Sequence, residues 1–207
     1  MTRAPHVVGL GGTTRAGSST ELALRHVLFA CERRGATIRL FSGAELETLP
    51  LYAPERPDRT EGAMTLIAEL RRADAVVLAS SSYHGAVAGL VKNAIDYVQD
   101  MAGDARPYLS DRPVGCIATG AGWQGAVATL GQLRTIVHAL RGWPTPLGVA
   151  INTVDRSFAP DGEILDAKVA VQLGLLVDDL SRFVARWNGA DAAVPAARGP
   201  SDPNGRA

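Results

Sequence analysis

The sequence predicts an α/β domain in which helices cover both faces of a doubly wound, five-stranded parallel sheet. Apolar strand-like runs alternate with helical patterns from one end of the chain to the other. Residues 76–78 and 149–151 are apolar at successive positions, as in strands that are covered on both faces. The short connections between these elements favour right-handed crossovers.

Each predicted strand is followed by a predicted helix. The strands are residues 7–10, 37–41, 75–80, 114–118 and 147–151. The helices lie near residues 18–33, 60–72, 89–101, 124–141 and 164–187. Residues 1–187 therefore form one domain. Residues 188–207 are rich in Ala, Gly, Pro and Asp without hydrophobic periodicity, which predicts a disordered C-terminal tail.

One connection is long enough to have a role of its own. Residues 42–59 contain three prolines and Tyr52, and their length is typical of a lid or an interface arm rather than a tight turn.

Composition limits the class of protein. Hydrophobic residues make up 46% of the 207 residues, and 21 basic residues balance 21 acidic ones. This balance argues against a nucleic-acid or membrane-surface partner, which would call for a basic excess. Cys31 and Cys116 have no metal-site or disulfide spacing and are read as small buried side chains. The N-terminus has no run that could serve as a signal peptide or membrane span, so we expect a cytoplasmic protein.

The stretch after the first strand is the strongest functional signal. Residues 9–20 read GLGGTTRAGSST, a loop of glycines and hydroxyls that opens into the first helix. Backbone N–H groups at a helix start favour an anion, and Thr13, Ser18, Ser19 and Thr20 add hydroxyl donors. Arg15 adds a fixed positive charge. Together these groups suit a phosphate.

Two common phosphate motifs do not fit. The dinucleotide fingerprint G-x-G-x-x-G has Thr14 at its third glycine, and the second strand lacks a final acidic residue for the ribose. The triphosphate loop G-x-x-x-x-G-K-[ST] has Ser18 in place of its lysine. A cradle for a single terminal phosphate remains.

The loops after strands one, three and four of a doubly wound sheet should meet beyond the carboxyl ends of the strands. Residues 80–87 supply hydroxyls, an aromatic ring and an imidazole. Residues 119–125 supply three glycines that let a flat ligand approach the backbone. The three loops together predict one binding site for a ligand with a phosphate and a flat ring.

These loops resemble those of the NAD(P)H-dependent FMN reductase family of the flavodoxin-like superfamily. Residues 12–20 are similar to the family's phosphate loop G-S-x-R-x-x-S-x-[NT], with Thr13 in place of serine. Residues 80–97 are similar to T-P-E-Y-[NH]-G…G-x-L-K-N-A-[IL]-D-W, and residues 118–122 to its glycine loop. The likeness spans residues 5 to 187. It implies a flavodoxin-like fold, with hydride transfer from NADPH or NADH to FMN.

The resemblance also implies residue roles. Thr13, Arg15, Ser18, Ser19 and Thr20 would hold the FMN phosphate. Tyr83, His84 and Gly85 would line the isoalloxazine, and Ser81 and Ser82 of the same loop would also bind the cofactor. Thr119, Gly120 and Gly122 would contact the pyrimidine edge of the flavin. Simpler readings stay open: Ser18 could be only a helix cap, and His84 only a loop histidine. No catalytic side chain or metal is expected, because the cofactor carries the chemistry.

The resemblance has one departure and leaves alternatives open. Ser81 and Ser82 stand where the family has proline and glutamate, and this departure bears on the rigidity of the loop and on the fit of the substrate. The acceptor could be a quinone, an azo compound, a metal oxyanion or a biosynthetic intermediate rather than free flavin. A flavodoxin-type electron carrier is a further alternative, although the acidic surface of such carriers is absent. Because the family's site usually lies at a dimer interface, a homodimer or homotetramer is implied.

Overall fold

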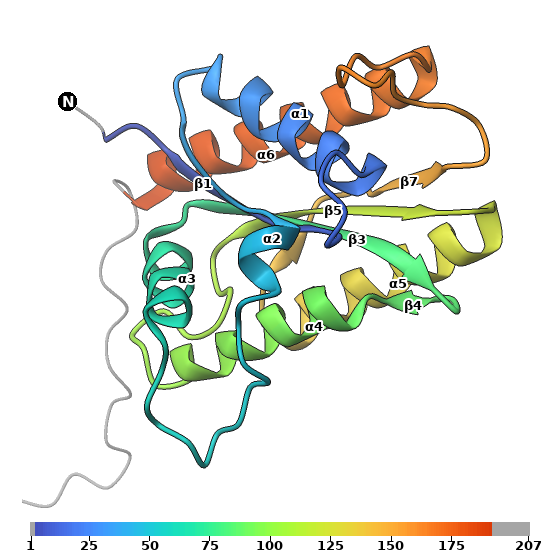
Figure 1. Cartoon of the computed structure of the whole chain (residues 1–207). Coiled ribbons are helices and arrows are strands. Elements are labelled where there is room, and N and C mark those ends of the chain that lie inside the picture. The colour runs from blue at the N-terminus through green and yellow to red at the C-terminus, as the bar shows by residue number, and fades with distance from the viewer. Residues whose placement is uncertain (1–2, 192–207) are drawn as a thin grey trace, which may run out of the picture.

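The computed structural model describes residues 3–191, which form a parallel sheet between two layers of helices (Figure 1). One face of the sheet carries helices α1 (Ser19–Glu32) and α6 (Ala167–Asp191). The other face carries α3 (Glu61–Arg72), α4 (Gly89–Asp96) and α5 (Trp123–Ala139). The predicted doubly wound architecture is confirmed.

The order of the strands has a reversal point inside the sheet. Its main path, β2-β1-β3-β5-β6, is parallel throughout. These strands are β1 (His6–Gly12), β2 (Thr37–Phe41), β3 (Ala75–Tyr83), β5 (Pro113–Gly120) and β6 (Trp143–Pro144). From β1 the chain first adds β2 on one side and then β3 on the other. The strand order therefore reverses at β1, where ligands bind in folds of this type.

The last predicted strand is preceded by a short strand, β6, that the sequence pattern did not predict. β6 pairs with the start of β5, and β7 (Val149–Asn152) pairs with its end, from Ile117 to Gly120. Between β6 and β7 lies Pro146, which has no N–H to donate to a ladder. The strand predicted at residues 147–151 is β7, which begins at Val149 and ends at Asn152.

Two hydrophobic cores hold the layers together, one on each face of the sheet. Alternate residues of β3 point to opposite faces, so that Val76 and Leu78 join the core under α3, α4 and α5. Val77 and Ala79 join the core under α1 and α6. Both cysteines are buried, as predicted: Cys31 lies in α1 and Cys116 in β5.

The structure contains short elements that the sequence pattern did not reveal. α2 (Gly43–Leu46) follows β2, and β4 (Ala86–Val87) pairs antiparallel with β3. The helix predicted at residues 89–101 is α4 followed by the 3-10 helix η1 (Tyr97–Met101). Helix α6 continues past residue 187, the predicted end of the domain, to Asp191. Residues 192–207 lie outside the described residues, so the tail stays a prediction.

The long connection after β2 is fastened to α4 and η1. The backbone N–H of Tyr52 donates to Asn93 Oδ1 at 2.9 Å, and Asn93 Nδ2 donates to the Pro50 carbonyl at 3.0 Å. Arg59 donates to both carboxylate oxygens of Asp100, at 2.6 and 2.8 Å. These bonds hold the connection against the helices. No helix among residues 3–191 is long and apolar enough to cross a membrane.

Candidate active site at the carboxyl edge of the sheet

A cavity of about 450 Å³ lies where the loops after β1, β3 and β5 meet. Its wall consists mainly of hydroxyl-bearing side chains and backbone. The lining residues are Thr13, Thr14, Arg15, Ser18, Ser19, Thr20, Ser81, Ser82, Tyr83, Thr119, Gly120, Ala121 and Thr153. The three loops predicted to meet are therefore brought together.

The first loop turns sharply into α1. The Thr13 hydroxyl accepts from the Arg15 N–H at 3.2 Å and donates to the Arg15 carbonyl at 3.1 Å, which closes a tight turn. Gly17 has φ +68°, a left-handed conformation that glycine adopts without strain. Ser18 then caps α1 by accepting from the Glu21 N–H at 3.3 Å. The capping role of Ser18 and its place in the cavity wall coexist.

Close packing fixes the base of this loop. A Cβ on Gly11, where φ is +151°, would lie 2.1 Å from the Ala79 carbonyl oxygen. A Cβ on Gly43, at the start of α2, would lie 1.9 Å from the Thr13 carbonyl oxygen. Both glycines let backbone pass against backbone directly beneath the cavity.

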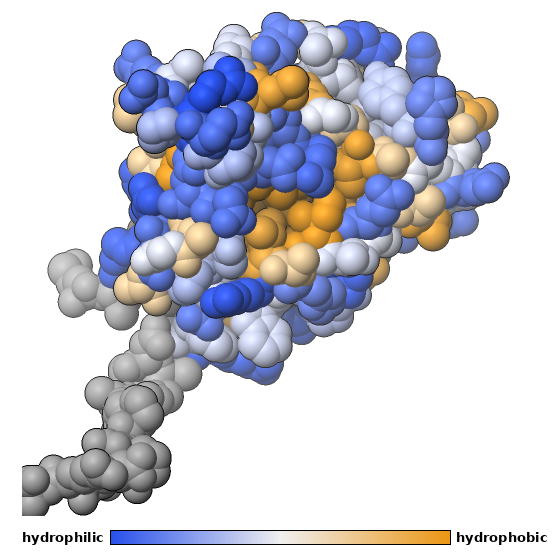
Figure 2. All heavy atoms as spheres, turned by 90° about the horizontal axis from the view of Figure 1, so that it is seen from below, coloured by the Kyte–Doolittle hydropathy of each residue, from blue (hydrophilic) through white to orange (hydrophobic). Residues whose placement is uncertain are grey.

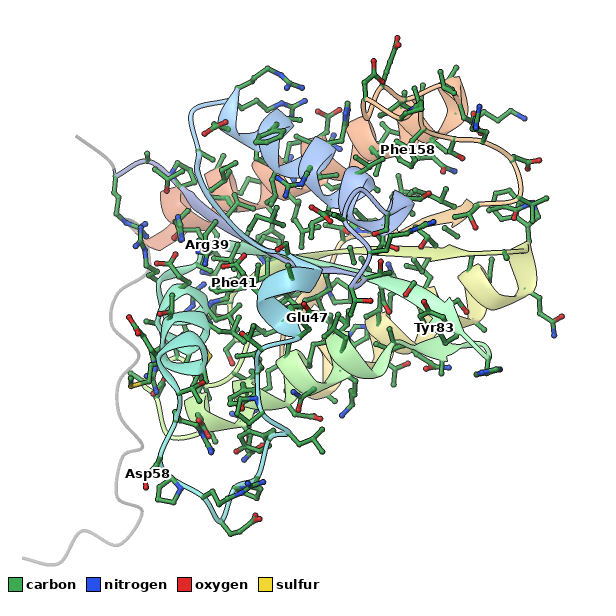
Figure 3. All side chains as sticks on the ribbon, in the orientation of Figure 1. Arg39, Phe41, Glu47, Asp58, Tyr83 and Phe158 are labelled. Atoms are coloured by element: carbon green, nitrogen blue, oxygen red, sulfur yellow. The ribbon has the colours of Figure 1, made fainter. Side chains whose placement is uncertain are left out.

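The second loop is a β-hairpin rather than an irregular loop. Tyr83 pairs with Ala86, and between them His84 (φ +55°) and Gly85 (φ +78°) form a two-residue turn with the geometry of type I′. Tyr83 is 60% exposed and lies on this hairpin at the end of the sheet (Figure 3). The side chain of Gln132 clamps the hairpin: its Nε2 donates to the Gly85 carbonyl at 2.8 Å, and its Oε1 accepts from the Val87 N–H at 3.2 Å.

The third loop leads from β5 into α5. Gly122 has φ +121° and precedes the first residue of α5, Trp123, which is 57% exposed. The Asn152 side chain holds the loop, since its Oδ1 accepts from the Gly122 N–H at 2.9 Å. Gly120 and Gly125 leave room for Ser82, whose side chain would collide with a Cβ at Gly125.

Three hydroxyl side chains form the floor of the cavity. Thr20, in the first turn of α1, and Thr119, at the end of β5, are buried, with their Oγ1 atoms 2.6 Å apart. Ser81 is the register partner of Thr119 on the adjacent strand. The Ser81 Oγ is buried without a hydrogen-bond partner among the described residues.

The charge of the wall favours an anion. Arg15 is exposed, and it is the one charged side chain in the described lining, which includes no carboxylate. The buried carboxylate in the first turn of α1, Glu21, pairs with Arg25 at 2.7 Å. The helix start and Arg15 therefore act on a ligand without an opposing negative charge.

Most of the predicted site residues lie in the cavity wall. All of them line the cavity except His84, Gly85 and Gly122, which build the adjoining turns instead. Sequence reasoning missed Thr14, Ala121 and Thr153 as lining residues, and Gln132 and Asn152 as the side chains that hold two of the loops. The contacts of Gln132 and Asn152 span 30 or more residues, so no local motif marks them.

The two cysteines take no part in this site. Burial raises the pKa of the Cys31 thiol to about 11 and that of Cys116 to about 12, so both are protonated at neutral pH. Within residues 3–191 no cluster of three His, Cys, Asp or Glu side chains could hold a metal ion. A more apolar hollow of about 420 Å³ lies at the opposite edge of the sheet, between Val7, Ala36 and Val184, and lacks a comparable set of hydroxyls.

The wall fits a ligand that is anionic at one end and carries hydroxyls. The start of α1 and Arg15 provide donors for an anion, and the unpartnered Ser81 hydroxyl leaves one hydrogen bond to be made. Gly85 and Gly122 lie in turns beside the lining residues Tyr83 and Gly120, at the ends of β3 and β5. FMN has this sequence of groups, since a polyhydroxyl chain joins its phosphate to a flat ring.

Comparison with known proteins agrees with this reading. The family model of the NADPH-dependent FMN reductases matches residues 5–156, which include all three loops. The chain belongs to this family. It is accordingly an NAD(P)H-dependent FMN reductase, an enzyme that works with FMN and a reduced nicotinamide.

Relatives and solved structures extend the comparison. An FMN-dependent NADPH-azoreductase of Staphylococcus haemolyticus is 26% identical over 84% of this chain and 92% of its own. The NAD(P)H:acceptor oxidoreductase of Paracoccus denitrificans superposes with a TM-score of 0.66 at 20% identity, over 88% of this chain and 98% of that one. A Streptococcus pneumoniae flavodoxin gives 0.58 at 11%, over 85% and 98%. The fold of this FMN reductase is therefore flavodoxin-like, as predicted.

Proposed function

We propose that the protein binds FMN in the 450 Å³ cavity, with the phosphate at the start of α1, and accepts hydride there from NADPH or NADH. The observation that carries this proposal is the convergence of three loop ends on one wall that has many hydroxyls, one arginine and no carboxylate. Such a wall suits a phosphate ester better than a cationic or purely apolar ligand.

The first loop supplies the phosphate contacts. Arg15 donates from its guanidinium, and Thr13, Ser18, Ser19 and Thr20 contribute hydroxyls or backbone N–H groups at the helix start. Because Ser18 already accepts from the Glu21 N–H, its hydroxyl proton is free to be donated to a phosphate oxygen.

The second and third loops form the slot for the ring. Tyr83 and Ser82 line it from the hairpin, and Thr119 and Gly120 line it from the end of β5. His84, Gly85 and Gly122 shape the turns on either side. When bound, FMN supplies the redox chemistry by taking up hydride from the nicotinamide and giving up electrons to an acceptor. The chain itself binds, orients and shields, so no acid, base or nucleophile of its own is required.

A titration separates phosphate recognition from ring binding. The apoprotein is titrated with FMN and with riboflavin, which lacks the phosphate, while flavin fluorescence is followed. We expect FMN to bind at least tenfold more tightly, because charge-assisted hydrogen bonds are each worth about 1.5–3 kcal/mol. Equal affinities would contradict the assignment of the first loop to the phosphate.

A second candidate concerns the electron acceptor. The Staphylococcus haemolyticus relative is named an FMN-dependent NADPH-azoreductase, and the hairpin here carries Ser81 and Ser82 where the family motif has proline and glutamate. An azo compound or quinone is therefore a candidate acceptor beside free flavin. Steady-state assays with FMN, a quinone and an azo dye rank these acceptors, and turnover of free flavin alone would remove the second candidate.

We further infer a cytoplasmic homodimer or homotetramer. The face that carries α3, α4 and α5 shows apolar side chains gathered at its centre within a polar rim (Figure 2). Exposed apolar side chains of the elements on this side include Leu51, Met64 and Val127. An apolar area of this kind is typical of a subunit interface. Sedimentation velocity tests the inference, and a monomer at micromolar concentration would refute it.

A further inference from the structure

Among the described residues that line the cavity, Ser81 carries the buried hydroxyl that lacks a hydrogen-bond partner. Its oxygen is buried and has no hydrogen-bond partner among the described residues. A buried hydroxyl without a partner costs free energy, and most such groups in folded proteins are paired. The neighbouring hydroxyls are satisfied, since Thr20 and Thr119 bond to each other at 2.6 Å.

The strand register fixes the direction of the Ser81 side chain. Ser80 points to the α4 side, because its hydroxyl accepts from the Ala88 N–H at 3.0 Å and donates to the Ser81 carbonyl at 2.8 Å. Successive residues of a strand point to opposite faces, so Ser81 points to the α1 side, beside its register partner Thr119. Ser81 lines the cavity there.

The position of Ser81 along the cavity selects the part of the ligand that it meets. The donors for a phosphate lie at the start of α1, and the ring slot lies near Tyr83, two residues further along β3. Ser81 lies between these two ends. The part of FMN between its phosphate and its ring is the ribityl chain, which carries several hydroxyl groups.

We propose that the Ser81 hydroxyl is a binding residue for the ribityl chain of FMN, and that this hydrogen bond supplies the partner that the side chain lacks without ligand. The inference rests on the proposed function, because it takes FMN as the occupant of the cavity. A serine reorients by rotation about one bond, between staggered rotamers. No protein hydrogen bond breaks when Ser81 turns toward the ligand, because its oxygen holds none.

The proposed contact needs a side-chain hydroxyl at position 81, which the family motif lacks. Proline, which the motif has here, carries neither a side-chain donor nor a backbone N–H. Ser81 therefore replaces a rigid residue with one that recognises hydroxyls.

The test combines a variant with a set of ligands. Full-length Ser81→Ala and unsubstituted apoprotein are titrated with FMN and with FMN analogues in which one ribityl hydroxyl at a time is replaced by hydrogen. We expect Ser81→Ala to bind FMN about three- to tenfold more weakly, the effect of one neutral hydrogen bond. With the analogue that lacks the contacted hydroxyl, the two proteins should bind equally.

The Tm of the apoprotein tests independently whether the Ser81 hydroxyl lacks a partner when no ligand is bound. Ser81→Ala should leave the apoprotein Tm unchanged or higher, because the substitution removes an unsatisfied group and no bond. A matched control is Thr129→Val, which removes the other buried unpartnered hydroxyl, on α5 and outside the cavity lining. This control should bind FMN with unchanged affinity. Should Ser81→Ala not fold, Ser81→Cys replaces the hydroxyl by a somewhat larger thiol that is only a weak donor, and it is expected to show the same loss.

Three results would overturn the inference. In the first, Ser81→Ala binds FMN as tightly as the unsubstituted protein does. In the second, Ser81→Ala binds FMN and every analogue more weakly than the unsubstituted protein by the same factor. In the third, the Ser81→Ala apoprotein melts at a lower temperature than the unsubstituted apoprotein. The second result would indicate a buried water or a general packing effect. In all three cases FMN still binds, whereas failure of the proposed function appears as absence of FMN binding in the unsubstituted protein.

Discussion

At the scale of single residues, Arg15 is the side chain on which phosphate recognition depends most. It is the one charged group in the described cavity lining, and it is exposed on a loop that the Thr13 turn holds in place. Arg15→Ala should weaken FMN binding about tenfold or more and leave riboflavin binding unchanged, because riboflavin has no phosphate. Arg33→Ala, an exposed arginine at the far end of α1, is the matched control. Equal losses for FMN and riboflavin would place Arg15 elsewhere in the site.

The residue scale also shows what local sequence can predict. Thr13, Ser18 and Thr20 could be predicted because glycines and hydroxyls at a strand-to-helix turn have a local meaning. Gln132 and Asn152 could not, because each acts on a loop that is distant in the sequence. The Thr20–Thr119 contact joins residues 99 positions apart, and only the folded sheet brings them together.

At the scale of elements, the strand-to-helix turn contains two glycines, Gly11 and Gly17, whose replacement should have different costs. A Cβ at Gly11 would collide with the Ala79 backbone, whereas a Cβ at Gly17 meets nothing within 4 Å. Gly17→Ala should therefore cost only about 1 kcal/mol, from its positive φ. Gly11→Ala should cost about 3 kcal/mol or more, because β1 and β3 must move apart. Urea unfolding of both variants measures the difference, and similar losses would refute the close packing.

The long connection after β2 should depend on pH through Asp100. The hydrogen bonds from Arg59 lower the pKa of the Asp100 carboxyl. A group whose pKa is lower in the folded state stabilises the fold above its unfolded pKa, which is about 3.9 for aspartate, and this stability is lost as the pH falls through the folded pKa. At pH 7, Asp100→Asn should lower the free energy of unfolding by about 1.5–3 kcal/mol, and the difference should shrink below about pH 4.

Asp96, which pairs with Lys92 on the exposed face of α4, is the control for this prediction. Asp96→Asn should change the unfolding free energy by less than about 1 kcal/mol at any pH, as for other exposed ion pairs. An Asp100→Asn effect that did not change between pH 7 and pH 3 would contradict the role of the Arg59 pair.

Among the elements, the long strands and helices could be predicted from the sequence and the shortest ones could not. The main strands and helices follow from apolar periodicity, and their order was predicted. Strand β6, the β3–β4 hairpin and α2 were not predicted, because two- and four-residue elements are too short to produce a period.

At the scale of the whole molecule, FMN should stabilise the fold, because the cavity wall comes from three loops of one sheet edge. A ligand that binds only the folded state at a hundred times its Kd adds about 2.7 kcal/mol to the free energy of unfolding. For a chain of this size that corresponds to a rise in Tm of about 5–10 °C. Differential scanning fluorimetry measures the shift, with inorganic phosphate at the same concentration as the control. A Tm that FMN leaves unchanged would contradict a preformed FMN site.

The central claim is that this chain uses a reduced nicotinamide to reduce FMN at the carboxyl edge of its sheet. Its most direct test is anaerobic mixing of the FMN-loaded protein with NADPH, and separately with NADH, while the visible flavin band is followed. We predict rapid bleaching with at least one donor, and the faster donor identifies the preference. A band that stays yellow with both donors would contradict the account and would indicate an electron carrier, or an FMN enzyme that takes hydride from another substrate.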